Sequence, residues 1–551
     1  MKPFALALLI LLTNTLHADE IGIATAHPMA TDAGIQTLKK GGNAFDAAIT
    51  VSAVLAVVEP YSSGIGGGGF WLLHDALHDE EIMLDGRETA PEKATANMYL
   101  DKDGNIIPKL SIDGPLAAGI PGAPAALVWL AKNKGDLKLQ QSLQPAIDAA
   151  RKGFPVDQHY RDMLKFRLKA IQQSPEAAKI FLHDNQIPEI GSIIKQPELA
   201  KTLERIAEKG NAGFYEGETA KKLVEDVTKA GGIWTLDDLK NYKVRLRTPI
   251  TVNYKDMRIT SAALPSSGGI VMSEIFNILA SYPLNDLDQA TRTHLIVEAM
   301  RRAYRDRAEY MGDEDFVTVP KNLLTSKAYA TGLRQSIRRD KATPSESLAP
   351  TWHETYKGTD TTHFSILDAD GNKVSATLSI NYPFGSGFVA KGTGVLLNDE
   401  MDDFSSKPGE PNVYGLVGNK ANAIEPNKRM LSSMSPTFVE TDDRIGIIGT
   451  PGGSRIITMV TLGALAFQQG KNAEEIVNLP RFHHQYLPDQ IQFETKAFDS
   501  KLQEALEKRG HKLEEKTSSW GNMHIVILDK TSGKVSSASD SRGIGKAVTS
   551  H

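Results

Sequence analysis

A threonine pair stands at the head of a strand-like segment deep inside this chain of 551 residues. Thr361 and Thr362 begin an alternating run, and a second strand-like run at residues 373–380 follows a turn at residues 370–372. The pattern predicts a β-hairpin with a hydroxyl group at its head. On this pattern alone, two adjacent threonines are explained by the preference of β-branched residues for strands.

The chemistry open to Thr361 depends on whether the chain is cut before it. An internal threonine hydroxyl is a poor nucleophile, but a cut would place a free α-amine on the same residue as a built-in general base. The α-amine of model peptides titrates at about pH 8, so much of it accepts a proton at neutral pH. Thr361 is therefore a candidate nucleophile for acyl transfer after a cut.

Further motifs occur in a fixed order around this pair. They are Ala26-His27-Pro28 and residues 41–48, 62–70, 85–91, 265–269, 360–363, 398–404, 431–436 and 450–455. Through them the chain resembles the gamma-glutamyltranspeptidase family, in its bacterial periplasmic form, over nearly its whole length after the leader. Thr361 matches the threonine before which members of that family cut themselves, so we expect cleavage between Asp360 and Thr361.

The resemblance also implies a fold and a division of the chain. It implies an α+β fold, the four-layer αββα sandwich of the N-terminal nucleophile hydrolases, in which the two pieces stay together as a heterodimer. We expect a signal peptide at residues 1–18, a large subunit at residues 19–360 and a small subunit at residues 361–551. The two subunits should form one interwoven globular unit.

The leader has the three parts of a secretory signal. Lys2 supplies the positive charge, Phe4 to Leu12 the apolar core, and Ala18 a plausible cleavage site. The apolar run is too short to span a bilayer, and no later run of about 18 apolar residues follows it. We therefore expect export to the periplasm or the medium, with no membrane span in the mature form.

Composition narrows the chemistry and the partners. The chain has no cysteine, which excludes a thiol nucleophile and disulfide bonds. Its net charge is -5, with both signs mixed throughout, which argues against a nucleic-acid partner. We expect small-molecule substrates instead.

Amide transfer needs donors where negative charge builds on the carbonyl oxygen. The apolar strand at residues 445–448 leads into Gly452 and Gly453, two glycines whose backbone N–H groups can turn toward a ligand. Without the resemblance this is an ordinary strand-to-helix turn. With it, Gly452 and Gly453 correspond to the oxyanion-hole glycines.

The implied substrate is a γ-glutamyl amide such as glutathione, whose free α-amino and α-carboxylate groups form a zwitterion. A site for it needs a cation and anions close together. The matching positions are Arg87 with Ser432 and Ser433 for the carboxylate, and Asn381, Glu400 and Asp403 for the amine. Considered without the resemblance, Arg87 would be interpreted as one partner of a surface ion pair, and residues 400–403 as an acidic loop.

The chain departs from the family pattern at Ser379, at Glu400, and at Tyr382-Pro383, which stands in place of small polar residues. Where many members have a second threonine that hydrogen-bonds the nucleophile, this chain has Ser379, which keeps the hydroxyl but loses the restricting methyl group. Where bacterial relatives often have glutamine, it has Glu400. Residues 408–418, with Tyr414, resemble the lid loop over the glutamyl group, which related cephalosporin acylases lack.

The remaining pattern indicates helices and one loose segment. Residues 124–229 are expected to be mainly helical, with a break at residues 153–155, and residues 293–310 form a helix dense with charge. We expect that charge to lie on a solvated, ion-paired face. Residues 330–359 show little periodicity. A loosely held segment just before Thr361 would allow the new carboxyl end to move away from the site after the cut.

No cofactor or metal is expected. Gly64, Gly66 and Gly69 satisfy a dinucleotide-binding fingerprint, but a helix precedes them and a strand follows, which is the wrong order for that mechanism. His483 and His484 are adjacent, and neighbouring residues of a strand point to opposite faces.

The sequence thus predicts a self-processing γ-glutamyl hydrolase and transferase with a threonine ester intermediate. A glutaryl or cephalosporin acylase on the same fold is the alternative enzyme. A scaffold protein that no longer cuts itself is an alternative of another class. An α/β-type serine hydrolase is disfavoured because the chain has no G-x-S-x-G motif.

Overall fold

The computed structural model describes residues 20–348, 361–407, 409–410, 412 and 414–550. Within these ranges the predicted hairpin is confirmed: β9 (Thr362–Leu367) pairs antiparallel with β10 (Lys373–Ser379). Gly371, in the turn between them, has a φ of 86°. The predicted leader, Asp360 and the end of the predicted loose segment lie outside the described residues.

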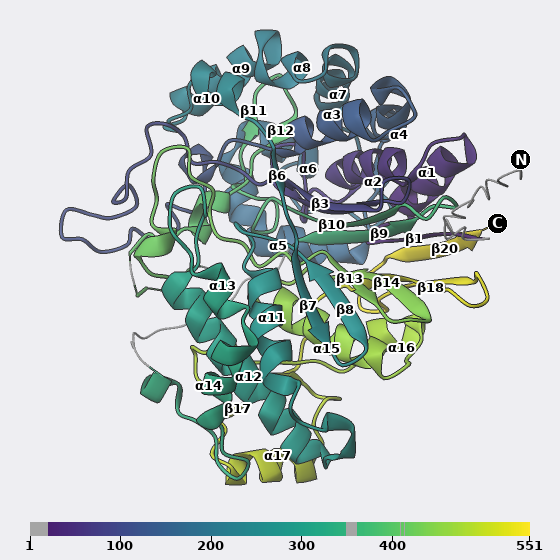
Figure 1. Cartoon of the computed structure of the whole chain (residues 1–551). Coiled ribbons are helices and arrows are strands. Elements are labelled where there is room, and N and C mark those ends of the chain that lie inside the picture. The colour runs from purple at the N-terminus through teal and green to yellow at the C-terminus, as the bar shows by residue number, and fades with distance from the viewer. Residues whose placement is uncertain (1–19, 349–360, 408, 411, 413, 551) are drawn as a thin grey trace, which may run out of the picture.

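The hairpin lies at the centre of a seven-stranded antiparallel sheet (Figure 1). Its order is β20-β1-β9-β10-β2-β3-β6, and Thr361 directly precedes β9. The other strands are β1 (Ile21–Thr25), β2 (Gly68–Asp75), β3 (Glu80–Gly86), β6 (Arg245–Arg247) and β20 (Lys546–Ser550). Because central strands are held on both sides, Thr361 stands at the end of a rigid support.

A six-stranded antiparallel sheet faces the first one. Its strands, in spatial order, are β19 (Val535–Ser539), β18 (His524–Asp529), β14 (Arg444–Gly449), β13 (Thr437–Glu440), β8 (Met257–Ser261) and β7 (Ile250–Tyr254). Buried hydroxyls join the two sheets, since Ser375 donates to the Ile448 carbonyl at 3.2 Å and Ser365 to the His524 carbonyl at 3.2 Å. The sheets therefore pack face to face across a shared core.

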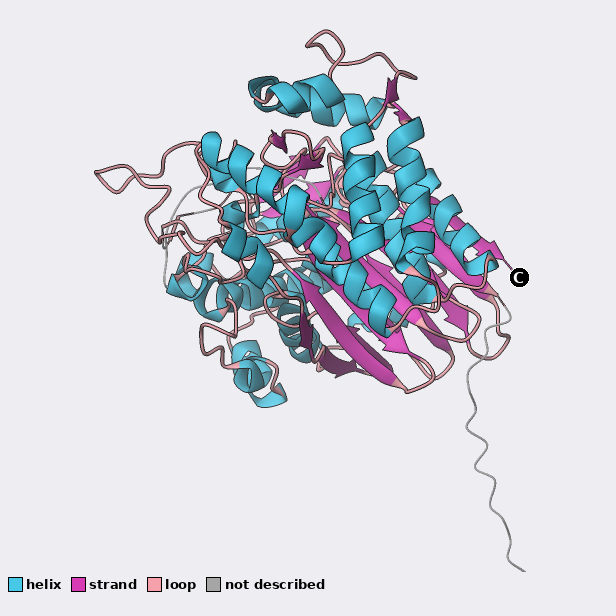
Figure 2. Cartoon of the chain, turned by 90° about the horizontal axis from the view of Figure 1, so that it is seen from above, coloured by secondary structure: helices cyan, strands magenta, loops and turns pink. Residues whose placement is uncertain are grey.

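Helices cover the outer faces of the sheets. Figure 2 shows helices lying over the strands when the molecule is seen from above. Above the seven-stranded sheet are α1 (Pro28–Lys39), α2 (Ala44–Val58), α3 (Ala123–Asn133) and α4 (Leu139–Lys152), and beneath the six-stranded sheet are α11 (Gly268–Leu279), α12 (Gln289–Tyr310) and α15 (Ile456–Gln468). All of α2 is buried, as a helix without a polar face must be.

The helical prediction for residues 124–229 is confirmed, with its break at β4 (Phe154–Pro155). The helices that follow are α5 (Gln158–Gln173), α6 (Pro175–Phe181), α7 (Pro197–Lys209), α8 (Ala212–Tyr215) and α9 (Gly217–Lys229). Beyond this region come α10 (Leu236–Asn241), α13 (Lys321–Leu324), α14 (Lys327–Gln335), α16 (Ala473–Val477) and α17 (Ser500–Lys508).

Both sheets draw strands from both sides of the predicted cut. The seven-stranded sheet takes β9, β10 and β20 from beyond residue 361, and the six-stranded sheet takes only β7 and β8 from before it. Strands from the two parts hydrogen-bond to one another in each sheet, as β1 does to β9. A cut before Thr361 would therefore leave two pieces joined by continuous sheets.

The charged helix α12 corrects one expectation. Its predicted ion pairs are present, as in the 2.6 Å bond from Arg302 to Glu298, but they do not face solvent. Glu298, Arg301, Arg302, Asp306 and Arg307 are each at most 4% exposed. Helical spacing in the sequence predicts which charged residues are neighbours. It does not predict that α11 and later parts of the chain cover them.

Among the described residues, no helix combines the length and the apolar character needed to cross a bilayer.

Candidate active site

A small cavity beside the start of β9 gathers most of the predicted site residues. Its lining includes Thr361, Arg87, Ser379, Asn381, Glu400, Asp403, Tyr414, Ser432, Ser433 and Gly453. Gly452 lines the neighbouring cavity, and Asp360 lies outside the described residues. Positions that are more than 300 residues apart in the sequence thus meet in one place.

Thr361 lies between two cavities. It lines the one that contains Arg87 and Gly453 and also the one that contains Gly452. No other residue of the described ranges lines both of these cavities, and Thr361 is 5% exposed. A group attached to Thr361 can therefore be approached from two sides.

Arg87 is the buried cation of the first cavity. It follows β3, its backbone N–H donates to Asp85 at 2.9 Å, and its side chain is 1% exposed. Its guanidinium pairs with Glu400 and, at 2.5 Å, with Asp403. Such a fork of donors matches paired carboxylate oxygens.

The acids around Arg87 are shifted toward their neutral forms. Burial raises the pKa of Glu400 to about 7, even though the Arg87 guanidinium lowers it. Burial also raises the pKa of Asp403 and raises that of Glu88 well above its usual range. Desolvation of the charged form outweighs the effect of the neighbouring cations in each case: Arg87 for all three acids and also Arg307 for Asp403.

Ser379 and Asn381 connect the hairpin to this acidic group. The Ser379 hydroxyl accepts from the Asn381 backbone N–H at 2.7 Å, and its proximity lowers the pKa of Glu400. The Asn381 side-chain amide donates to the Asp399 carbonyl at 3.0 Å. Ser379 therefore orients one of the predicted amine-binding groups.

The glycine pair forms the turn between β14 and α15. Gly452 has a φ of 138° and Gly453 a φ of 57°, and both conformations favour glycine. The short helical turn Gly453–Arg455 leads directly into α15. Backbone N–H groups at such a helix start carry partial positive charge and lack partners within the helix.

Tyr414 closes the cavity on the side of the predicted lid. Its hydroxyl donates to the Asn381 carbonyl at 2.7 Å, and its side chain is 8% exposed. Gln485 donates to the Gly415 carbonyl at 3.0 Å, which ties the same loop to another part of the chain. Residues 408, 411 and 413 of the lid prediction lie outside the described residues.

Sequence reasoning missed Arg307, which supports the serine pair. From α12, it donates to Ser267 at 2.9 Å and to Ser433 at 3.2 Å, and Ser267 in turn donates to the Ser432 carbonyl at 2.8 Å. Burial lowers the pKa of Arg307. Arg307 is one of many charged residues in this helix, so the sequence pattern did not predict its contact with the serine pair.

One cluster in the described residues has donor atoms close enough for a metal: His294, Glu298 and His511. The two histidine rings already hydrogen-bond each other at 2.8 Å, and Glu298 pairs with Arg301 and Arg302. The donors are thus engaged, and two guanidinium groups lie beside them.

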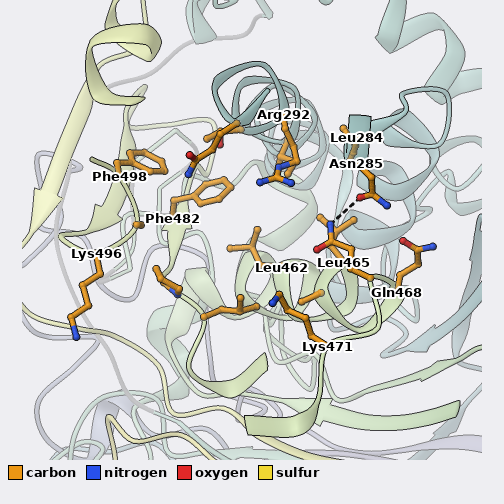
Figure 3. A pocket seen from close by; sticks show the side chains of 18 of the residues that line it. Leu284, Asn285, Arg292, Leu462, Leu465, Gln468, Lys471, Phe482, Lys496 and Phe498 are labelled. Atoms are coloured by element: carbon orange, nitrogen blue, oxygen red, sulfur yellow. Dashed lines mark hydrogen bonds between the residues drawn. The ribbon is translucent and has the colours of Figure 1, made fainter. Parts of the chain in front are cut away.

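A larger cavity, shown in Figure 3, shares no residue with the candidate site. Arg292 points into it opposite Leu462. Gln469 and Asn285 belong to its lining, and Gln469 donates to Asn285 at 3.0 Å. Phe482 and Phe498 form an apolar wall. Its lining contains no carboxylate to receive an amine, so the predicted chemistry is not located there.

Comparisons with known proteins agree with the geometry. The chain is 45% identical over 495 residues to a glutathione hydrolase proenzyme of Pseudomonas sp. (strain A14), covering 89% of this chain and 86% of that protein. It is 42% identical over 527 residues to a glutathione hydrolase proenzyme of Escherichia coli (strain K12), covering 95% and 90%.

Solved structures show the same relationship. A cephalosporin acylase from Bacillus halodurans matches with a TM-score of 0.84 at 28% identity, covering 100% of this chain and 98% of that one. A gamma-glutamyltranspeptidase from Helicobacter pylori matches with a TM-score of 0.58 at 41% identity, covering 60% and 96%. A family model described as gamma-glutamyltranspeptidase matches residues 30–550, and the chain belongs to the gamma-glutamyltranspeptidase family.

Proposed function

We propose that this chain is the precursor of an enzyme that cuts itself before Thr361 and then cleaves the γ-glutamyl amide of glutathione and related compounds. It passes the glutamyl group to water or to the amine of an amino acid or peptide. The observation that carries the proposal is the meeting of Thr361, Arg87, Glu400, Asp403 and Gly453 in one cavity.

Charge complementarity explains how the donor is held. The donor's α-carboxylate lies beside Arg87 with Ser432 and Ser433, and its α-ammonium beside Glu400 and Asp403. Arg87 already pairs with Glu400 and Asp403, so an entering zwitterion exchanges ion pairs within the protein for ion pairs with the ligand. The cost of burying the ligand's charges is thereby offset by hydrogen-bonded partners.

Asn381 contributes a further polar group to the amine side of this cavity. Because the donor is held by its α-groups, the amine on the far side of the scissile bond is left comparatively unrestrained. Such a site discriminates strongly for the acyl part and weakly for the leaving group.

The reaction follows from the positions of Thr361 and the glycine turn. Thr361 Oγ1 attacks the γ-carbonyl carbon, and its own α-amine takes the hydroxyl proton and gives it to the departing amine. The backbone N–H groups of Gly452 and Gly453 stabilise the oxyanion. An acceptor then attacks the γ-glutamyl ester and restores the threonine.

The architecture is consistent with the finer assignment of the fold. We infer that the order of helices, sheet, sheet and helices is the four-layer αββα sandwich of the N-terminal nucleophile hydrolases. Residues 19–360 form the large subunit and residues 361–551 the small subunit of one interwoven heterodimer, after removal of a signal at residues 1–18. The enzyme acts in the periplasm or the medium.

Denaturing gels and N-terminal sequencing test this proposal directly. By simple scaling of the chain mass of 59.9 kDa, the mature protein gives fragments of about 37 and 21 kDa after signal removal, and the smaller begins at Thr361. Thr361→Ala leaves the chain whole and inactive. Two fragments from that variant, or full activity in an uncut wild-type chain, would refute the assignment.

A cephalosporin-type acylase is the second candidate, favoured by the match to the Bacillus halodurans enzyme. Its glutaryl substrates lack the α-amine that Glu400 and Asp403 are placed to receive. Turnover of a γ-glutamyl anilide is therefore expected to exceed that of the glutaryl anilide by at least about tenfold, because one charged contact is lost. Preference for the glutaryl compound would reverse the assignment.

A further inference from the structure

Self-cleavage poses a problem that the mature reaction does not. The base in the mature enzyme is the α-amine of Thr361, and before the cut that nitrogen is part of a peptide bond. An amide nitrogen cannot accept the hydroxyl proton, so another group must do so. The identity of this group depends on the surroundings of Thr361 in the uncut chain, and the inference below rests on the proposed function.

Glu59 is a buried carboxyl group next to this threonine. It immediately follows the fully buried helix α2 and is 3% exposed. It accepts a 2.7 Å hydrogen bond from the hydroxyl of Thr362, the neighbour of Thr361. Glu59 and Thr361 also line the same cavity, on the side away from Arg87.

The other titratable groups that line this cavity have contacts of their own. Arg542 pairs with Glu494 and Asp540. His159 packs edge-on against Tyr61, with ring centroids 5.0 Å apart, and burial lowers its pKa. Glu59 is the titratable side chain of this cavity that hydrogen-bonds the strand carrying Thr361.

The protonation of Glu59 suits proton transfer at neutral pH. Burial raises the pKa of Glu59 to about 7, against the lowering effect of the Thr362 hydroxyl, while the nearby charge of Asp157 raises it further. A carboxyl group with such a pKa exchanges protons readily near pH 7. The geometry already places it beside the reacting residue.

We infer that Glu59 is the proton acceptor for self-cleavage and has no such role in the mature reaction. The Glu59 carboxylate takes the proton of Thr361 Oγ1, and the oxygen bonds to the carbonyl carbon of residue 360. The bond from that carbon to the nitrogen of Thr361 breaks, and the nitrogen takes the proton from Glu59. Water then hydrolyses the ester, leaving a carboxylic acid and a free Thr361 hydroxyl.

Glu59→Gln separates this role from a structural one. The amide oxygen still accepts the Thr362 hydrogen bond, whereas the proton acceptor is lost. We expect the first-order rate of precursor loss on gels to fall about 100-fold at pH 7.5. Turnover per cut molecule should fall far less. His159→Gln, which removes another titratable group of the same cavity, should cut itself within about threefold of the wild-type rate.

The pH profile of self-cleavage supplies a second test. The wild-type rate should rise with pH and level off above about 7, following ionisation of Glu59. Thr362→Val removes a hydrogen bond that stabilises the carboxylate, so the midpoint should move to higher pH. A purely structural Glu59 would leave the midpoint unchanged.

The outcomes separate this inference from the proposed function. Equal rates for wild type and Glu59→Gln, or an unshifted midpoint in Thr362→Val, would overturn the role of Glu59 even if the smaller fragment begins at Thr361. A wild-type chain that is never cut at Thr361 would instead refute the proposed function. Should Glu59→Gln fail to fold by circular dichroism, the Thr362→Val profile still decides.

Discussion

The hydroxyl of Tyr414 donates a 2.7 Å hydrogen bond to the backbone carbonyl of Asn381. The tyrosine belongs to the lid region, and Asn381 lies just beyond the hairpin that begins after Thr361. Asn381 is itself held in a left-handed conformation, with a φ of 73°. The predicted lid is thus fastened to the strand end that presents the proposed amine-binding groups.

Tyr414→Phe should loosen this attachment without removing the ring. Loss of the hydrogen bond leaves a buried carbonyl unpaired, which costs about 1–3 kcal/mol in the closed form. We expect KM for the γ-glutamyl donor to rise about fivefold or more, measured with a γ-glutamyl anilide. Self-cleavage on gels serves as the control, and an unchanged KM would contradict the role of this contact.

Gly453→Ala should damage the turn itself. An added Cβ would lie 2.4 Å from the Tyr414 ring, and the φ of 57° is unfavourable for alanine. Displacing a proposed oxyanion donor is expected to lower kcat about 100-fold or more.

Gly332→Ala is the matched control for Gly453→Ala. Gly332 lies in α14, and a Cβ there meets nothing within 4 Å. This change should leave kcat unaffected and stabilise the helix by up to about 1 kcal/mol in urea unfolding. Equal effects of the two substitutions on kcat would argue against a special role for the turn.

Glu400→Gln should weaken donor binding and remove a pH dependence. The pKa of Glu400 is raised to about 7, so the wild-type site gains its negative charge as pH rises through neutrality. Wild-type KM should therefore fall between about pH 6 and 8, whereas the variant should show a flat KM raised about tenfold or more. A variant with the wild-type pH profile would rule out Glu400 as its source.

The same shift has a consequence for stability. Because Glu400 holds its proton more tightly in the folded state, its ionisation destabilises the fold as pH rises from about 4.5 through about 7. Glu400→Gln should lose less unfolding free energy than wild type over this window, as measured by urea denaturation at several pH values.

Ser379→Ala should move the titration of Glu400 in a defined direction. The Ser379 hydroxyl lowers the pKa of Glu400, so removing it should shift the KM profile to higher pH. The loss also leaves the Asn381 N–H without its 2.7 Å acceptor. Ser379→Thr retains the hydroxyl and should preserve the midpoint; a shift equal to that of alanine would exclude loss of the hydroxyl as its cause.

The sequence predicted the hairpin, the helices and the order of the motifs because these depend on neighbours along the chain. Alternation around Thr362, the Gly371 turn and the apolar run of α2 each express a local period. The resemblance of the motifs supplied the candidate residues, although not their geometry. The charge run of α12 shows the limit, since its periodicity was correct and its expected exposure was wrong.

The sequence by itself determined which chemistry was available: a threonine that could become N-terminal, a paired glycine turn, and cations and acids of the right type. Only the tertiary structure decided that Arg87 pairs with Glu400 across 313 positions, and that Glu59 meets Thr362 across 303. Contacts of this range depend on how the two sheets and their helices pack, and no local pattern encodes them. The same packing buries the acids and thereby raises their pKa values.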